Sequence, residues 1–389
     1  MSAQALYHVI FLGGLDARKT KISDAILARA NDLGLPPQAI GFLGESDVMT
    51  RDIAIPAIGI FLGGASVTGD TPEVAELIDG SIPIAPIVSR VEAVSVEIPP
   101  QLRHVNALPI DVSGTGIERA ASLVFETFRL LRGERRLFIS YRRVDSQPLA
   151  DRLYDELDKR GFDVFIDTRA VPPAADFQSV LWHRMSDADV VVLIDTEGFR
   201  DSRWTVEELT RANATNIQIL HILWPGQEED RGSALSYYFP LTIADFSDGE
   251  PATGATISEE AVTRICDQAE ALRARAIAAR HAYLVDSFCD AARDYGLEPS
   301  VQPERWISLP TKDGRTLAVV PIVGLPTSTR INEVFEAIDD AGATRDRWII
   351  FDNRGLLDAW LKHLDWLNAH LPVRAVWVSS APDKLKGLV

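Results

Sequence analysis

Short apolar runs alternate with helical patterns along the chain, and this alternation limits its fold more than any other feature. In the first third, apolar runs at residues 7–12 and 39–43 lie on either side of residues 22–33, where apolar side chains recur at helical spacing. The same alternation returns between residues 136 and 224 and again between 306 and 378. Strands that alternate with helices form mostly parallel sheets. We therefore predict an α/β fold throughout the chain.

Length and breaks in this pattern divide the chain into three predicted domains. Its 389 residues are enough for two or three domains of ordinary size. We place a first α/β domain at residues 1–132, a central domain at 133–247 and a C-terminal α/β domain at 256–389, whose role the sequence does not indicate. The C-terminal domain is predicted to begin with a long helix from Ser258 to about Tyr295. Because the link at residues 132–134 is so short, we expect the first two domains to pack together.

The charge of the chain excludes two classes of partner. Its formal net charge is −17 at pH 7, whereas binding to nucleic acid or to an anionic membrane surface needs clustered cations. We therefore expect no direct nucleic-acid partner and no membrane partner. The one local basic cluster comprises Arg129, Arg132, Arg135, Arg136, Arg142 and Arg143. The first four are predicted to be solvated arginines at a helix end and a strand start.

Cysteine use and apolar content indicate a cytoplasmic protein. Cys266 and Cys289 have no metal-ligand spacing and are predicted to be buried, inert thiols in a reducing compartment. The first residues lack the pattern of a secretory leader, and no run of 18 apolar residues occurs. The histidines, including His183 and His221, have no serine or cysteine partner at a recognisable spacing. We therefore predict core or surface histidines, no hydrolytic triad and no metal centre.

Polar side chains follow the predicted strands of the central domain at the points where these strands end, which is the edge where open parallel sheets bind ligands. An arginine there can hold a pyrophosphate through paired, charge-assisted hydrogen bonds. An indole offers its face to a pyridinium or an adenine. Pyrophosphate, pyridinium and adenine are all parts of NAD. The candidate binding residues are Ser140, Tyr141, Arg142, Arg143, Asp167 and Trp204.

The order of these motifs resembles the Toll/interleukin-1 receptor (TIR) domain, in particular the bacterial TIR domains that cleave NAD. The resemblance covers roughly residues 135–225 and rests on the segments 138–143, 161–167, 187–194 and 202–209. It implies a central flavodoxin-like parallel sheet. It also implies an NAD+ glycohydrolase of bacterial anti-phage defence or abortive infection, with no cofactor beyond its substrate. The first domain is similar to a TIR-like or flavodoxin-like domain that lacks the site residues.

The resemblance further implies partners and a mode of activation. TIR domains associate with one another, so homotypic self-association is expected, and a signal nucleotide or a protein activator is a possible further partner. The sequence does not say whether the product is ADP-ribose or a cyclic form.

Glu208 is the candidate catalytic residue. Cleavage between nicotinamide and ribose develops positive charge on the sugar, which a nearby carboxylate stabilises or attacks. On a helix, Glu208 lies about 40° around the axis from Trp204, and Glu207 about 60° on the other side. This margin is modest, and the family pattern, in which the acid comes four residues after the tryptophan, favours Glu208.

Each candidate also has a structural interpretation. Glu208 fits a capping box with Thr205, Trp204 can be a packing residue, and Tyr141 can be a phenol at the sheet edge. Asp167 can merely begin a turn. If these interpretations hold, the protein is a non-catalytic scaffold or adaptor that signals through TIR contacts.

Overall fold

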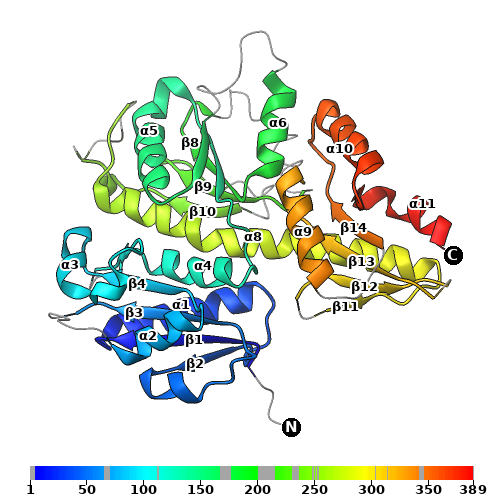
Figure 1. The fold of residues 1–389 in the computed structure, drawn as a ribbon. Helices are drawn as coiled ribbons and strands as arrows, with labels where there is room; N and C mark the ends of the chain where they lie inside the picture. Colours follow the sequence, from blue (N-terminus) through cyan, green and yellow to red (C-terminus); the bar gives the residue numbers. More distant parts are fainter. Residues whose placement is uncertain are drawn as a thin grey trace.

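The structure is a computed structural model that describes most of the chain (Figure 1). The described residues are 5–64, 71–111, 114–166, 177–199, 215–229, 236–247, 249, 251, 254–302, 304–312, 314–340 and 346–388. They form three sheets of five strands each. Within the described residues, no helix combines the length and the apolar character needed to cross a bilayer.

The first sheet is parallel throughout and has the order β2-β1-β3-β4-β5. Its strands are β1 (Tyr7–Gly13), β2 (Ile40–Leu43), β3 (Ala57–Leu62), β4 (Ile84–Val88) and β5 (Leu108–Pro109), and its helices are α1 (Ala17–Asp32), α2 (Pro72–Asp79), α3 (Val94–Glu97) and α4 (Ile117–Thr127). Helix α1 begins where the Asp16 side chain accepts a hydrogen bond from the Arg18 N–H. The two-residue strand β5 is not predicted from the sequence, because it is too short to show a pattern.

The central sheet is also parallel and has the order β10-β9-β8-β6-β7. Its strands are β6 (Arg136–Ser140), β7 (Asp163–Ile166), β8 (Val190–Asp195), β9 (Gln218–Leu223) and β10 (Ser236–Pro240), with helices α5 (Arg143–Lys159) and α6 (Phe177–Asp187). Counted within each domain, both sheets have the strand order 2-1-3-4-5, which is the flavodoxin-like order. The predicted α/β fold with a central flavodoxin-like sheet is therefore confirmed.

Helix α5 begins earlier than the sequence indicates. Ser146 is predicted to be its N-cap, but the helix starts at Arg143 and bends at Ser146, whose φ and ψ of −136° and 19° are not helical. Pro148 follows within the helix and cannot donate to the preceding turn, so the regular hydrogen-bond ladder starts only beyond it. The predicted end of the helix is confirmed by Gly161, whose φ is +81°.

The third sheet is mixed. In the order β11-β12-β13-β14-β15, the first two pairs are antiparallel and the last two are parallel. Its strands are β11 (Ser300–Val301), β12 (Ile307–Pro310), β13 (Thr316–Pro321), β14 (Asp346–Phe351) and β15 (Val373–Trp377), with helices α9 (Ser328–Asp340), α10 (Asp358–His370) and α11 (Ala381–Leu385). Helices α9 and α10 share a core with one face of this sheet, and α11 lies in the core of the other face.

Helix α8 (Glu259–Asp294) connects all three parts. The Ser258 hydroxyl caps it as predicted, accepting a hydrogen bond from the Ala261 N–H at 3.1 Å. With 36 residues it is about 54 Å long, and it runs between the first two domains and on into the third (Figure 1).

Successive stretches of α8 lie in different hydrophobic cores. Residues from Ala261 to Leu272 belong to the core of the central sheet, Ala274 and Ile277 to that of the first sheet, and residues from Leu284 to Ala292 to that of the third. The sequence assigns this helix to the third domain, but in the structure it is shared. Both cysteines lie on it and are buried, as predicted.

A buried network of ion pairs forms where the three parts meet. Arg273 of α8 is fully buried, and its Nε and Nη1 atoms lie 2.8 Å from Asp189 Oδ2 and 2.5 Å from Glu126 Oε1. The Nε of Arg132 lies 2.7 Å from the other oxygen of Asp189. Burial pushes the pKa of Asp189 upward, but Arg132 and Arg273 outweigh it and hold this pKa below its ordinary value.

This network corrects the prediction for part of the basic cluster. Arg129 is exposed, as expected, whereas Arg132 and Arg135 are not solvated. Their side chains are 10% and 4% exposed, and Arg135 pairs with Glu126 and Glu270. The prediction was wrong because two of the partners, Glu270 of Arg135 and Asp189 of Arg132, come from segments far away in the sequence.

Replacing Arg273 tests the network. We expect Arg273→Met to lower the free energy of unfolding by about 3–5 kcal/mol, because it leaves buried carboxylates without a partner. The matched control is Arg275→Met on the same helix, because Arg275 is 54% exposed and pairs with Asp32 at 3.3 Å. The control should cost less than about 1 kcal/mol. Urea unfolding followed by tryptophan fluorescence measures both, and equal losses would contradict this account of the junction.

Candidate functional site

The carboxyl ends of the five central strands meet at one edge of the sheet, because all these strands are parallel. Near this edge a row of residues crosses four strands. Ser140 of β6 is paired with Leu193, Leu193 with His221, and His221 with Tyr238 of β10. The sheet therefore brings a hydroxyl, an imidazole and a phenol into one line, in the region where ligands bind to folds of this kind.

Arg142 is oriented by a carboxylate in the first turn of α5. Its Nη1 lies 3.0 Å from Asp145 Oδ2, and the same oxygen accepts a hydrogen bond from Thr196 Oγ1 at 2.9 Å. Thr196 directly follows β8, so Asp145 ties the start of α5 to the loop after that strand. The Arg142 side chain remains 39% exposed. It is therefore oriented by the protein and still accessible to an anionic ligand.

Gly198 makes room for this arginine. A Cβ atom at this position would lie only 1.7 Å from Arg142 Nη1 and 2.7 Å from its Cζ. The guanidinium thus lies against bare backbone of the loop after β8, and a side chain at position 198 would force it to shift. The glycine matters here for its lack of a side chain and not for a left-handed conformation.

The other predicted residues at the end of β6 have different surroundings. Ser140 is 3% exposed and Tyr141 is 7% exposed. Tyr141 lies in the core with Leu149 and Trp224, on the side of the sheet covered by α5 and α8. Arg143 is exposed at the first position of α5. Among these residues, Arg142 keeps 39% of its side chain exposed while Asp145 orients its guanidinium.

Three predicted site residues lie outside the described residues. Asp167 comes one position after the end of β7, and Trp204 and Glu208 belong to the segment 200–214. Their placement stays a prediction from the sequence, as does that of the predicted loop at 168–176.

A buried histidine–aspartate pair near the same edge was missed by the sequence analysis. His221 Nε2 lies 2.9 Å from Asp195 Oδ2, and these residues are 2% and 1% exposed. The ring of Tyr238 stacks on His221 with a centroid distance of 5.0 Å. Within the described residues, His221 Nδ1 and Asp195 Oδ1 have no hydrogen-bond partner.

This pair could have been found from the sequence. His221 was predicted to be a core or surface histidine, and it is buried, but only serine and cysteine partners were considered for it. Asp195 ends one predicted strand and His221 lies in the next, so the two were candidates for neighbours in a parallel sheet. The pair joins the ends of β8 and β9 beside Thr196.

His183 has a structural role. Its Nδ1 accepts a hydrogen bond from the Leu357 N–H at 3.4 Å, which connects α6 with the third domain. Burial, followed by Arg184 and Arg136, lowers the pKa of His183. Among the described residues, no group of three or more histidine, cysteine or acidic side chains is placed to hold a metal ion.

A cavity of the described structure lies away from this edge. It measures about 750 Å³ and lies between α6 and residues 354–359, with Trp182 and Leu357 in its wall. Thr215 and Ile217, which precede β9, place it toward the amino-terminal edge of the central sheet. It therefore does not coincide with the edge that carries Arg142.

Comparison with known proteins identifies one family. Residues 137–260 match the family model described as the TIR domain. The chain therefore contains a TIR domain whose matched part extends from β6 to the start of α8. No curated protein matches the chain.

The chain also has distant similarity to solved structures. One is a putative LacI transcriptional regulator from Bacteroides fragilis, with 10% identity, coverage of 57% of this chain and 78% of that one, and a TM-score of 0.19. Another is the C-terminal domain of glucosamine-fructose-6-phosphate aminotransferase from Francisella tularensis, with 10% identity, coverage of 70% and 84%, and a TM-score of 0.21. At such TM-scores neither carries an argument about this protein.

A double-mutant cycle tests the coupling of Asp195 and His221. Asp195→Ala alone should lower the free energy of unfolding by about 1–3 kcal/mol, because it leaves a buried imidazole nitrogen without a partner. Adding His221→Phe, which keeps a ring against Tyr238, should cost less than the sum of the single changes, with a coupling of about 0.5–3 kcal/mol. Urea unfolding of the four proteins measures this term, and additive losses would show that the pair is not coupled.

Proposed function

We propose that the TIR domain at residues 137–260 makes this protein an NAD+ glycohydrolase that cleaves the bond between nicotinamide and ribose. The observation that carries the proposal is Arg142, an oriented and partly exposed guanidinium at the carboxyl edge of the sheet. The family resemblance adds a cytoplasmic role in bacterial anti-phage defence or abortive infection, with self-association of TIR domains and an upstream signal as the means of activation.

Arg142 suits the pyrophosphate of NAD+. A guanidinium can donate two parallel hydrogen bonds to phosphoryl oxygens and keeps its charge at all physiological pH values. Asp145 orients this guanidinium through one nitrogen, Nη1. A guanidinium has five N–H donors, so the remaining ones can bind a ligand.

The reaction itself would depend on Glu208. When the glycosidic bond breaks, its electron pair leaves with nicotinamide and the ribose becomes an oxocarbenium-like cation. The carboxylate of Glu208 would stabilise this cation until water adds to the anomeric carbon and releases a proton, giving ADP-ribose. Trp204 would hold the pyridinium or adenine by its ring face, and Ser140, Tyr141, Arg143 and Asp167 would complete the binding edge.

The buried Asp195–His221 pair would support this edge from the interior of the domain. It is buried and joins two strand ends next to Thr196, which in turn contacts the carboxylate that orients Arg142. The pair is thus connected to the guanidinium through the backbone from Asp195 to Thr196 and then through the hydrogen bonds of Asp145. A rigid edge of this kind favours binding in one geometry.

The second candidate function is a non-catalytic scaffold that assembles through TIR contacts. Tyr141 favours it, because this residue packs into the core as the structural interpretation predicts. The pairing of Arg142 with Asp145 is also compatible with a purely structural arginine. The two functions differ in whether purified protein releases nicotinamide.

Glu208→Gln separates the two functions. It removes the charge with little change in shape, so we expect nicotinamide release from NAD+ to fall at least about 100-fold, as for other losses of transition-state stabilisation. Glu207→Gln is the matched control and should stay close to wild type. Chromatographic detection of free nicotinamide measures both. Unchanged release in Glu208→Gln would exclude this residue as the catalytic group, and no release from wild type at any protein concentration would favour the scaffold.

Arg142→Ala tests the binding of the pyrophosphate. The loss of a charge-assisted contact worth about 1.5–3 kcal/mol should raise KM for NAD+ by roughly 10- to 100-fold. Arg143→Ala, one position along the chain, is the matched comparison and should change KM much less, because the proposal places the pyrophosphate on Arg142. If both variants keep the KM of wild type, Arg142 does not hold the substrate.

A further inference from the structure

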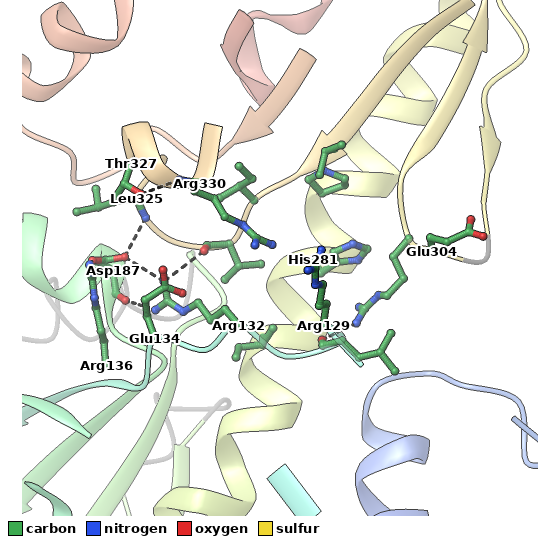
Figure 2. Close-up of a pocket in the computed structure, with 17 residues that line it drawn as sticks. Arg129, Arg132, Glu134, Arg136, Asp187, His281, Glu304, Leu325, Thr327 and Arg330 are labelled. Carbon is green, nitrogen blue, oxygen red and sulfur yellow. Dashed lines mark hydrogen bonds and ion pairs between the residues drawn. The ribbon is translucent and has the colours of Figure 1, made fainter. Parts of the chain in front are cut away.

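A second cavity lies where the three parts of the chain meet (Figure 2). It measures about 110 Å³ and is lined by residues from the end of the first domain, the start of the central domain, helix α8 and the third sheet. None of the candidate residues for NAD+ binding belongs to it. It lies beside the amino-terminal ends of β6 and β8, whereas the candidate site lies beyond their carboxyl ends.

The lining of this junction cavity is positively charged. Five arginines and three carboxylates line it, and two further carboxylates just outside the lining, Asp189 and Glu333, pair with Arg132 and Arg330. The arginines are Arg129, Arg132, Arg136, Arg305 and Arg330. A cationic lining is unexpected in a chain whose net charge is −17, since a protein of this charge has carboxylates available for most arginines.

The carboxylates do not neutralise the cavity evenly. Asp187 pairs with both Arg132 and Arg136 on one side. Glu134 and Glu304 are exposed, and Figure 2 shows the carboxylate of Glu304 turned away from the other labelled side chains. The opposite side of the cavity therefore has cations with little compensation.

Arg305 is the clearest uncompensated cation. Its Nη1 donates to the Leu130 carbonyl at 3.0 Å, and within the described residues no carboxylate lies within ion-pair distance of it. Burial lowers the pKa of Arg305, and the attraction that opposes this comes from the Tyr7 phenol. Burial and then Arg305 lower the pKa of the neighbouring His281 to about 4, so this imidazole is neutral at pH 7.

Two of the arginines also have unusual backbone conformations. The φ angles of Arg129 and Arg305 are +57° and +67°, in the left-handed region that residues with a side chain seldom adopt. Among the described residues, only Ser81 and Asn216 share this feature outside glycine. Arg129 is the left-handed residue that ends α4, a common way for a helix to end. Here both turns bring arginines to the same cavity.

We propose that the junction cavity is a binding site for a phosphate-bearing anion, which Arg305 and Arg330 hold from the third domain and Arg129 from the first. Arg330 reaches toward this space from α9 (Figure 2). Its side chain is 35% exposed and its ion-pair partner, Glu333, is 50% exposed. A solvated pair of this kind is weak and can rearrange around a ligand.

The arrangement favours a phosphoryl group over a carboxylate. A phosphate monoester carries nearly two charges and three acceptor oxygens that point in different directions, so it can bind guanidiniums from several sides. A carboxylate is planar and matches a single guanidinium. The small enclosed volume fits one phosphate or diphosphate group and not a whole nucleotide, whose remainder would have to lie outside the cavity.

Binding at this place would connect the three parts of the chain. The first domain contributes Arg129, the third contributes Arg305 and Arg330, and α8 contributes the wall with Ile277 and His281. An anion held by all of them stabilises their relative arrangement by mass action. The site does not depend on NAD+ cleavage and would give the central domain a means of responding to a second ligand.

Calorimetric titration of the full chain with sodium pyrophosphate tests the proposal. The titration is done in the Arg142→Ala background, because the central edge offers similar chemistry. We expect one site per chain, and an affinity that falls about tenfold in Arg330→Gln and in Arg305→Gln, the usual effect of losing one charged hydrogen bond. Arg315→Gln is the matched control, because Arg315 pairs with Asp346 elsewhere in the third domain. Pyrophosphate should also raise the unfolding temperature of the control. The rise should be much smaller in the two pocket variants.

The source of the phosphoryl group is distinguished by a second titrant. If ADP binds more tightly than pyrophosphate and loses affinity in the same two variants, the site takes a nucleotide with its base outside the cavity. If ADP binds as tightly as pyrophosphate or more weakly, the site takes the free anion. Either of these two results supports the proposal. The proposal is overturned if neither pyrophosphate nor ADP binds at millimolar concentration in the Arg142→Ala protein. It is also overturned if Arg330→Gln binds pyrophosphate as tightly as the control does. This variant is expected to remain folded, because the ion-pair partner of Arg330 is solvated.

Discussion

The buried ion pair between Arg273 and Asp189 is the interaction on which the arrangement of this chain depends. Asp189 is fully buried, and its two oxygens are held by arginines from different parts, Arg132 at the end of the first domain and Arg273 on the long helix. Taking such charges out of water costs several kcal/mol per ion unless every partner is in place. The relative positions of the first domain, the central sheet and α8 therefore all depend on the same set of ion pairs.

The same strand that begins beside this pair ends at the candidate site. Strand β8 follows Asp189 directly and closes with Asp195, the partner of His221. Six residues of strand span about 20 Å, so the junction and the ligand-binding edge lie at the two ends of one rigid element. Arg142 then depends on this edge through Asp145 and Thr196. The proposed catalytic edge and the proposed anion site are thus separate in space but share a backbone segment.

Local patterns predicted most of the described fold, and long-range partners account for what they missed. The Ser258 cap and the acidic first turn after it located the start of α8, and the apolar run ending at Ser140 located β6, because both signals lie within a few residues. The solvated arginines predicted at 132 and 135 were wrong, since Glu126, Glu270 and Asp189 meet them only after folding. Arg142 was predicted as a ligand-binding residue, and this role stays a prediction, although the structure shows its guanidinium oriented by Asp145. The placement of Asp167, Trp204 and Glu208 stays a prediction from the sequence.

The shared helix also decides how the chain can be divided. Because α8 contributes in turn to the central, first and third cores, a cut at any point along it removes apolar side chains from at least one of them. A fragment that stops near residue 260, where the family match ends, would leave the central sheet without the helix that covers one of its faces. The TIR domain of this protein is therefore not an autonomous module, and expression of the isolated segment would yield an incomplete core prone to aggregation.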